Sequence, residues 1–228
     1  MIDQFKRSGI DITVGQASTF AALTDFMLDY NQKVNLTRIT DPKEIIEKHY
    51  IDSILPLTMI DVPRGTKIID VGTGAGFPSL PMKIFRPDLD ITMLDSLRKR
   101  ITYLELVCKE LNVDAVRVNM RSEDAGKDKK YREKYGIAVA RAVAPLNVLA
   151  EYCLPFVTVG GYFLAMKGEK DESGDALSAI SELGGKITEI KHYNLPSGDK
   201  RILIITKKIK ETPQKYPRAS AAISKKPL

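Results

Sequence analysis

The residues best suited to binding a small molecule form one short run, DVGTGAGFP at positions 70–78. Glycines in such a run permit a tight turn and let a ligand approach the backbone closely. The run follows an apolar stretch at 67–71 and precedes a segment of helical periodicity at 77–85, so we expect it to join a strand to a helix. A glycine turn that binds nothing is the alternative, and the strand-to-helix context favours a ligand.

The acidic residue before the glycines discriminates between two nucleotide ligands. Dinucleotide sites read G-x-G-x-x-G and hold a pyrophosphate at the helix N-terminus. Here Gly72, Gly74 and Gly76 alternate, and Asp70 precedes them. A carboxylate there would repel a pyrophosphate but can accept hydrogen bonds from an ammonium group. S-adenosylmethionine carries an ammonium group and no phosphate, so the pattern favours this cofactor over NAD, with Asp70 and the three glycines at its site.

A second carboxylate follows at the expected distance for a nucleoside ligand. Asp95 ends the second predicted strand, 21 residues after Gly74. A carboxylate in this place can accept hydrogen bonds from both ribose hydroxyls. The alternative is an N-cap for the helix expected to begin near Leu97. After a glycine turn we favour the ribose contact.

Four basic residues lie at the ends of predicted strands. Arg121, Arg141 and Lys167 follow strands, and Arg201 precedes the last strand, which we expect to run antiparallel. All four would then lie at the sheet edge that carries the glycine turn. They predict a basic rim around the ligand pocket, in preference to four unrelated surface charges.

The elements that position these residues alternate between strands and helices, which predicts an α/β fold with a mostly parallel sheet of seven strands closed by an antiparallel last pair. The expected strands are 67–71, 91–94, 115–118, 137–140, 162–166, 187–193 and 202–206. Helices are expected at 18–34, from Asp41 onward, and at 77–85, 97–111, 145–157 and 175–183. Pro63-Arg64-Gly65 breaks the pattern. We therefore expect a helical extension at 1–63, the main domain at 64–210 and a basic tail at 211–228.

Composition and charge narrow the class of protein. The net charge is +6, and segment 207–228 alone holds seven basic residues against one glutamate. Contact with a polyanion and a merely solubilising tail remain equally open. No secretion signal or membrane-length apolar run is present, and Cys108 and Cys153 lie in apolar helical patterns. We expect a cytoplasmic protein without a membrane partner, and no metal site, because the two histidines lack neighbouring ligands.

The chain resembles the bacterial GidB/RsmG methyltransferases in seven stretches spread over nearly its whole length. They are NQKVNLT (31–37), HYIDS (49–53), DVGTGAGFP (70–78), LDSLRKR (94–100), RAVAPL (141–146), MKG (166–168) and KKPL (225–228). Each stretch is short, and it is their combination that makes the resemblance specific.

The resemblance implies the Rossmann-like class I fold of S-adenosylmethionine-dependent methyltransferases and methylation of N7 of a guanine in 16S ribosomal RNA. The substrate would be the small-subunit RNA or the assembling 30S subunit. It implies a cofactor site lined by Gly72, Phe77, Ser122, Glu123 and Arg141. Arg141 and Lys167 are the catalytic candidates. The candidates for RNA binding are Lys99, Arg121, Lys167 and Arg201.

Guanine N7 has a free lone pair and no proton, so its attack on a sulfonium methyl needs no general base. The sequence offers no nucleophile–base pair, which agrees with catalysis by placement and exclusion of water. Two alternatives stay open. One is a nicotinamide-dependent oxidoreductase, and the other is a ribosome-assembly factor that has kept the fold without catalysis.

Overall fold

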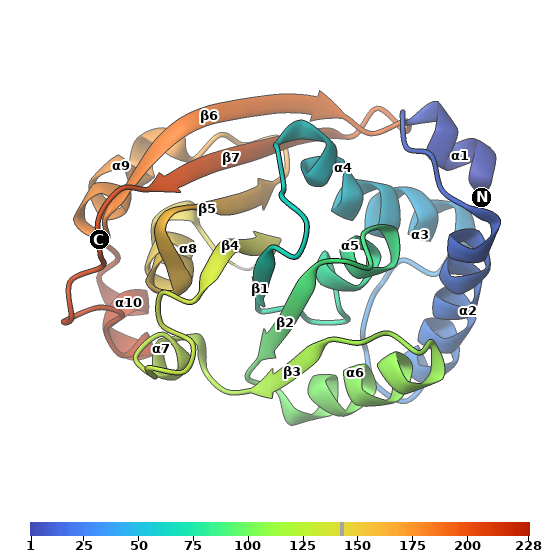
Figure 1. Ribbon diagram of the computed structural model, residues 1–228, viewed down its shortest axis with the longest axis horizontal. Helices are drawn as coiled ribbons and strands as arrows, with labels where there is room; N and C mark the ends of the chain where they lie inside the picture. Colours follow the sequence, from blue (N-terminus) through green and yellow to red (C-terminus); the bar gives the residue numbers. More distant parts are fainter. Residues whose placement is uncertain (142–143) are drawn as a thin grey trace.

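A seven-stranded sheet, in the order β3-β2-β1-β4-β5-β7-β6, runs through the computed structural model, which describes residues 1–141 and 144–228 (Figure 1). Neighbouring strands pair in parallel except β7, which is antiparallel to β5 and to β6. This arrangement confirms the predicted mostly parallel sheet with its antiparallel last pair. The strands are β1 (Lys67–Val71), β2 (Asp90–Asp95), β3 (Val116–Asn119), β4 (Tyr135–Arg141), β5 (Val157–Lys167), β6 (Gly185–Asn194) and β7 (Lys200–Lys208).

The order of the strands places a crevice between β1 and β4. From β1 the chain proceeds to β2 and β3 on one side, and the strands after β3 are added on the other side of β1. Ligands of open α/β sheets bind outside the carboxyl ends of the strands at such a reversal. The glycine run follows β1 and Arg141 ends β4, so the strand order alone brings these two features together.

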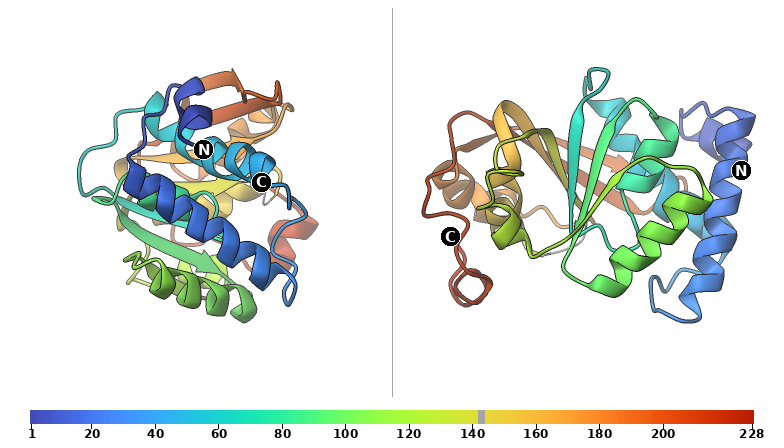
Figure 2. Two further views of the ribbon diagram at one scale, coloured as in Figure 1. Left: turned by 90° about the vertical axis from the view of Figure 1, so that its right-hand side faces the viewer. Right: turned by 60° about the horizontal axis from the view of Figure 1, so that its bottom comes forward.

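Helices cover both faces of the sheet (Figures 1 and 2). One apolar core joins the N-terminal helices, α5 and α6 to the sheet, and a second core joins α7 to α9 to the opposite face. The inner strands β1, β2, β4 and β7 are near-continuous apolar runs because both of their faces are buried, whereas the edge strands β3 and β6 are largely exposed. The helices are α1 (Ile2–Arg7), α2 (Val14–Asn31), α3 (Pro42–Ile45), η1 (Ile46–Ile51), α4 (Asp52–Met59), α5 (Ser79–Phe85), α6 (Arg98–Glu110), α7 (Ser122–Ala125), α8 (Leu146–Cys153), η2 (Leu154–Phe156), α9 (Ser173–Glu182) and α10 (Ser220–Lys225).

The N-terminal segment is helical, as its periodicity predicts, and it packs on the sheet. Phe20 stacks between Phe5 and Tyr50, with ring centroids 5.2 and 4.9 Å apart. The Tyr50 hydroxyl meets the Thr24 hydroxyl at 2.8 Å, so its polar end is satisfied inside the core. These side chains belong to the same apolar cluster as Ile68 of β1. The division into 1–63, 64–210 and 211–228 stays a prediction.

Most predicted elements are present, and the differences are local. Asp41 caps α3 as expected, and its side chain accepts hydrogen bonds from the backbone of Lys43 and Glu44. The predicted helix from Asp41 contains a π-helical turn, η1, before α4. Ser122–Ala125, where no helix was predicted, forms one helical turn, and the tail contains α10. None of the helices in the described ranges is long and apolar enough to cross a lipid bilayer.

Candidate functional site

A cavity of about 490 Å³ opens beyond the carboxyl ends of β1 and β2, where the strand order predicts a ligand site. Six parts of the chain contribute to its wall: the loop and helix of the N-terminal segment, the glycine turn, the end of β2 with the start of α6, the turn into α7, the end of β4, and α8 with the C-terminal tail. The lining residues include Leu36, Thr37, His49, Gly72, Gly74, Phe77, Asp95, Arg100, Arg121, Ser122, Glu123, Arg141, Tyr152 and Ser220.

The glycine turn combines an open position with a closed one. Gly74 has a φ of +60°, and a Cβ added there would meet only a backbone oxygen 4.0 Å away, so the space above it is free for a ligand. Gly76 has a φ of +90°, and a Cβ added there would overlap the Leu80 side chain. Gly72 lines the cavity and donates its N–H to the Leu94 carbonyl at 2.9 Å. Gly72 and Gly74 thus face the cavity, whereas Gly76 serves close packing.

Asp70 lies behind the turn and is not part of the cavity wall. It is fully buried, and its Oδ2 accepts a hydrogen bond from the Ser79 backbone N–H at 3.2 Å. Its Oδ1 has no partner among the described residues. Burial raises the pKa of Asp70 to about 6, and its hydrogen bonds oppose this shift. We predicted direct contact with an ammonium group, and this structure instead gives Asp70 the task of fixing the turn to the start of α5.

Asp95 ties the glycine turn to the end of β2. Its Oδ2 accepts hydrogen bonds from Gly74 N–H at 3.0 Å and from Arg100 Nη1 at 3.1 Å, and its Oδ1 accepts one from Leu97 N–H at 2.8 Å. The N-cap of α6 is Leu97 itself, so the alternative that Asp95 is the N-cap is wrong. A carboxylate accepts about four hydrogen bonds, which leaves about one for a ligand while Arg100 stays in place.

His49, Phe77 and Arg141 form a packed partition at one side of the cavity. The His49 and Phe77 rings stack with centroids 4.5 Å apart, and the Arg141 guanidinium lies 5.3 Å from the Phe77 centroid. His49 Nδ1 lies 3.4 Å from Arg141 Nη2, and its Nε2 lies 2.9 Å from Thr37 Oγ1. Burial, and then the Arg141 charge, lower the pKa of His49 to about 3. The imidazole is therefore neutral near pH 7, and because Arg141 donates to Nδ1, its proton lies on Nε2.

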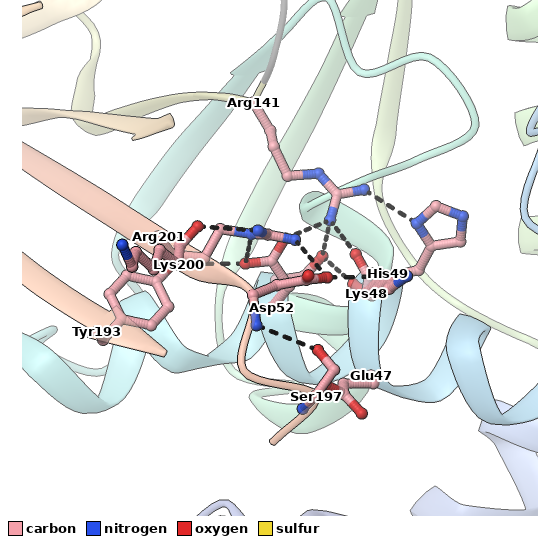
Figure 3. A network of polar contacts seen from close by, with 11 residues as sticks. Glu47, Lys48, His49, Asp52, Arg141, Tyr193, Ser197, Lys200 and Arg201 are labelled. Atoms are coloured by element: carbon pink, nitrogen blue, oxygen red, sulfur yellow. Dashed lines mark hydrogen bonds and ion pairs between the residues drawn. The ribbon is translucent and has the colours of Figure 1, made fainter. Parts of the chain in front are cut away.

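A second cavity of about 300 Å³ adjoins the first at this partition and shares His49 and Arg141 with it. The buried Asp52 carboxylate occupies its wall (Figure 3). Asp52 accepts hydrogen bonds from Arg201 Nε at 3.2 Å and from Arg141 Nη1 at 3.4 Å. The lining residues are Ile39, Lys48, His49, Asp52, Arg141, Met166, Lys167, Gly168 and Arg201.

The structure distributes the predicted basic rim over these two cavities. Arg121 lines the first, Arg141 lines both, and Lys167 and Arg201 line the second. Lys167 is only 9% exposed, and its amine contacts the Ala144 carbonyl at 2.7 Å and the Glu172 carboxylate at 2.8 Å. It is therefore held in place and is not a freely mobile surface cation. Lys99 is exposed on α6 and lines neither cavity.

Several cavity residues had no predicted role. The loop that carries Thr37 is held by Asn31, whose Oδ1 accepts hydrogen bonds from the N–H groups of Leu36 and Thr37 at 2.7 and 3.0 Å. The N-terminal residues of the first cavity lie in the stretches NQKVNLT and HYIDS, which resemble the family. The resemblance did not predict that the N-terminal helical segment forms part of the cavity wall. Ser220 of the tail meets the Tyr152 hydroxyl at 3.3 Å, and both line the first cavity. In the stretch RAVAPL, residues 142 and 143 lie outside the described residues.

Part of the charge in segment 207–228 is paired with the body of the protein. Lys208 is fully buried and lies 3.3 Å from the Glu133 carboxylate. Arg218 makes a 2.6 Å ion pair with Glu151, and Lys215 pairs with Glu182 at 3.0 Å. The charge excess of this segment is therefore only in part available to a polyanion. No cluster of three or more metal-ligating side chains occurs among the residues that the structure describes.

Comparisons with known proteins agree with this architecture. The family model described as "rRNA small subunit methyltransferase G" (GidB) matches residues 16–198. The protein named ribosomal RNA small subunit methyltransferase G of Alkaliphilus oremlandii is 49% identical over 96% of this chain and 93% of its own length. Its namesake in Acetivibrio thermocellus is 50% identical over 96% and 92%.

The solved structure of an S-adenosylmethionine-dependent O-methyltransferase from Thermotoga maritima aligns with a TM-score of 0.53 at 15% identity, over 81% of this chain and 72% of that one. At this identity the likeness concerns the fold, which is the class I methyltransferase fold that the resemblance implies.

Proposed function

The chain belongs to the GidB family of small-subunit rRNA methyltransferases, and from this premise we propose that its first cavity binds S-adenosylmethionine and its second cavity receives the base that is methylated. The chain is an S-adenosylmethionine-dependent methyltransferase acting on small-subunit ribosomal RNA. The finer statements are that the acceptor is N7 of a guanine and that the named residues hold the two reactants. Because the substrate is ribosomal RNA, we also place the protein in the cytoplasm.

The observation that carries the proposal is the partition shared by the two cavities. A methyl group can pass from one bound molecule to another only where their sites meet. His49 and Arg141 line both cavities, and Phe77 of the glycine turn supports both side chains. The two cavities therefore share a border at His49 and Arg141, and the donor and the acceptor would meet along it.

The residues of the first cavity fit the cofactor. The free space above Gly74 admits the ligand close to the backbone, and Asp95 would accept a ribose hydroxyl. Ser122 and Glu123, at the first turn of α7, would contact the adenine base. The bound cofactor supplies a methyl group on a positively charged sulfur.

The protein's own part in the reaction is placement. The acceptor nitrogen carries no proton, so no residue has to remove one. His49 is neutral and both of its ring nitrogens are engaged, which suits it to shaping the partition and excluding water. Arg141 and Arg201 present N–H groups that can contact the guanine O6 or flanking phosphates. The base would have to leave any stack it occupies to enter the second cavity.

Two binding measurements and one transfer assay test the proposal. Calorimetric titration should show binding of S-adenosylhomocysteine and none of NADH, because the oxidoreductase alternative predicts the reverse. Purified protein and methyl-labelled cofactor should then be incubated separately with naked 16S rRNA, with small-subunit particles and with large-subunit particles. Label in small-subunit RNA alone supports the proposal, and the comparison of naked RNA with particles identifies the substrate form. Binding without transfer to any RNA would favour the non-catalytic assembly factor.

A further inference from the structure

We propose that Asp52 is a positioning residue for methyl transfer, which holds Arg141 and Arg201 as one bridged pair in the wall of the second cavity and places a negative charge beside the acceptor base. This inference rests on the proposed function of the two cavities. It concerns a residue that contacts neither the first cavity nor the glycine turn.

The geometry brings three distant parts of the chain to one carboxylate (Figure 3). Asp52 begins α4, Arg141 ends β4, and Arg201 lies at the start of β7. Arg201 Nε lies 3.2 and 3.3 Å from the two Asp52 oxygens, and Arg141 Nη1 lies 3.4 Å from Oδ2. The Tyr193 hydroxyl approaches Oδ1 at 3.5 Å. Asp52 is only 4% exposed, so water offers its oxygens little competition.

The Asp52 carboxylate is surrounded by basic residues in the lining of the second cavity. Among the described residues that line the cavity, Asp52 is the only acidic one. The basic lining residues are Lys48, Arg141, Lys167 and Arg201. Lys48 has Glu44 and Asp199 as partners, and Lys167 has Glu172, all of which lie outside the lining. The two guanidinium groups share Asp52 between them.

The reaction moves a positive charge toward this cluster. The N7 lone pair forms the new bond to the methyl carbon, and the carbon–sulfur bond breaks with its electron pair remaining on sulfur. The sulfonium becomes a neutral thioether, the guanine becomes a cation, and no proton moves. Two arginines beside the base would oppose that change by like-charge repulsion, and a carboxylate shared by both offsets part of it.

Each arginine also donates a hydrogen bond to a backbone carbonyl. The loss of Asp52 should therefore change the orientation of the arginines more than the folding of the chain. Arg141 donates to the Lys48 carbonyl at 3.0 Å, and Arg201 donates to the Lys200 carbonyl at 3.0 Å. We therefore expect both side chains to stay in the neighbourhood without Asp52, but to lose their common orientation.

The test uses the full-length protein with small-subunit particles and methyl-labelled cofactor in single-turnover assays at saturating RNA. Asp52→Asn keeps the shape of the side chain and removes its charge. We expect its rate to fall on the order of 100-fold, with S-adenosylhomocysteine affinity and RNA affinity changed less than about threefold. Asp52→Glu, which restores the charge, should recover a large part of the rate.

Asp199→Asn is the matched control. Asp199 lies 3.9 Å from Arg201 and 3.7 Å from Lys48, has a side chain that is 43% exposed, and does not line the cavity. Its variant should stay within about threefold of the wild-type rate, because exposed ion pairs contribute little. An Asp52→Asn variant with the wild-type rate, an equal loss in both variants, or a loss of RNA affinity with full turnover at saturation would each overturn the proposal.

Should Asp52→Asn not fold, the double variant Asp52→Asn/Arg201→Gln removes the buried charge together with one partner. It should be slower than Arg201→Gln alone, because Asp52 still orients Arg141 in the single variant. Equal rates would overturn the proposal. A wild-type protein that transfers no methyl group at all would instead contradict the proposed function.

Discussion

The His49 imidazole lies flat against the Phe77 ring, with centroids 4.5 Å apart and planes 13° apart. This contact joins the N-terminal helical segment to the last position of the glycine turn before Pro78 and α5. It also supports Arg141, whose guanidinium lies over the same ring. The segment that we predicted as an extension therefore supplies part of the lining that the two cavities share.

The buried state of His49 predicts a specific pH dependence of stability. Its pKa is lowered from 6.5 to about 3 on folding, so between these values the unfolded chain binds a proton that the folded protein does not. Stability from this group is complete above pH 6.5 and is lost as the pH falls toward 3. Asp70 acts oppositely, because its pKa rises from 3.8 to about 6 and its ionisation costs stability as the pH rises through that window.

We expect His49→Gln to flatten the acid side of the stability profile. At pH 4.5 the histidine effect amounts to roughly 2–3 kcal/mol. Urea unfolding at pH 4.5 and 7.5 measures it, with His192→Gln, at the other and exposed histidine, as the control. Equal pH dependence in wild type and His49→Gln would show that His49 is not held neutral by the fold.

Gly74 and Gly76 should respond differently to the same substitution. Gly74→Ala places a methyl group in the ligand space, so S-adenosylhomocysteine affinity should fall at least tenfold, at a folding cost of about 1–2 kcal/mol for the positive φ. Gly76→Ala overlaps Leu80 and should mainly lower thermal stability. Calorimetry and thermal melts separate the two effects. A folded Gly74→Ala protein with unchanged affinity would remove the cofactor from this turn.

Asp95→Ala should weaken S-adenosylhomocysteine binding by about 1.5–3 kcal/mol, because a charged acceptor is lost and Gly74 N–H loses its partner. The control is Arg100→Gln, which keeps the Asp95 carboxylate and removes one of the two hydrogen bonds that its Oδ2 accepts. If Arg100 competes with the ribose, its replacement should leave affinity intact or raise it. Loss of stability alone in Asp95→Ala would restrict that residue to the local fold.

The tail should separate into a structural part and an RNA-contacting part. Arg218→Met leaves the buried Glu151 carboxylate without its partner, which should cost about 3 kcal/mol of stability and loosen Ser220 at the first cavity. Lys225 and Lys226 are exposed and make no ion pair among the described residues. Their joint replacement by glutamine should lower RNA affinity and reduce the salt dependence by up to about two units of slope, at unchanged stability.

Binding measured from 50 to 300 mM salt, together with thermal melts, checks both parts. A joint lysine variant with the wild-type salt slope would make these lysines solubilising residues, the alternative that charge alone leaves open. Full stability of Arg218→Met would show that the tail is not fastened through Glu151.

Local signals sufficed for the sheet and for the glycine turn. The strands β1 and β4 are short apolar runs whose two buried faces leave a clear pattern, and Gly72, Gly74 and Asp95 follow strand ends at recognisable spacing. Arg141 was found in the same way, because it ends a strand at the sheet edge. These features depend on neighbours within a few residues or on the regular order of parallel strands.

Contacts between residues far apart in the sequence could not be predicted from such local patterns. Asp52 joins residues 89 and 149 positions away, and nothing in its own stretch marks those partners. Lys208 lies in a segment whose charge suggests a solvated surface, and its burial depends on Glu133 and on Thr212 of the folded tail. The helical turn at Ser122 is too short for periodicity to show.

Nucleoside analysis of small-subunit RNA tests the central claim most directly. RNA from a strain lacking this gene should be methylated in vitro by the purified protein, digested, and analysed by mass spectrometry against authentic methylguanosines. We predict one additional 7-methylguanosine per small-subunit RNA, absent from the untreated RNA and absent when the cofactor is omitted. A methyl group on another atom or another base, or none in a protein that binds S-adenosylhomocysteine, would contradict the account.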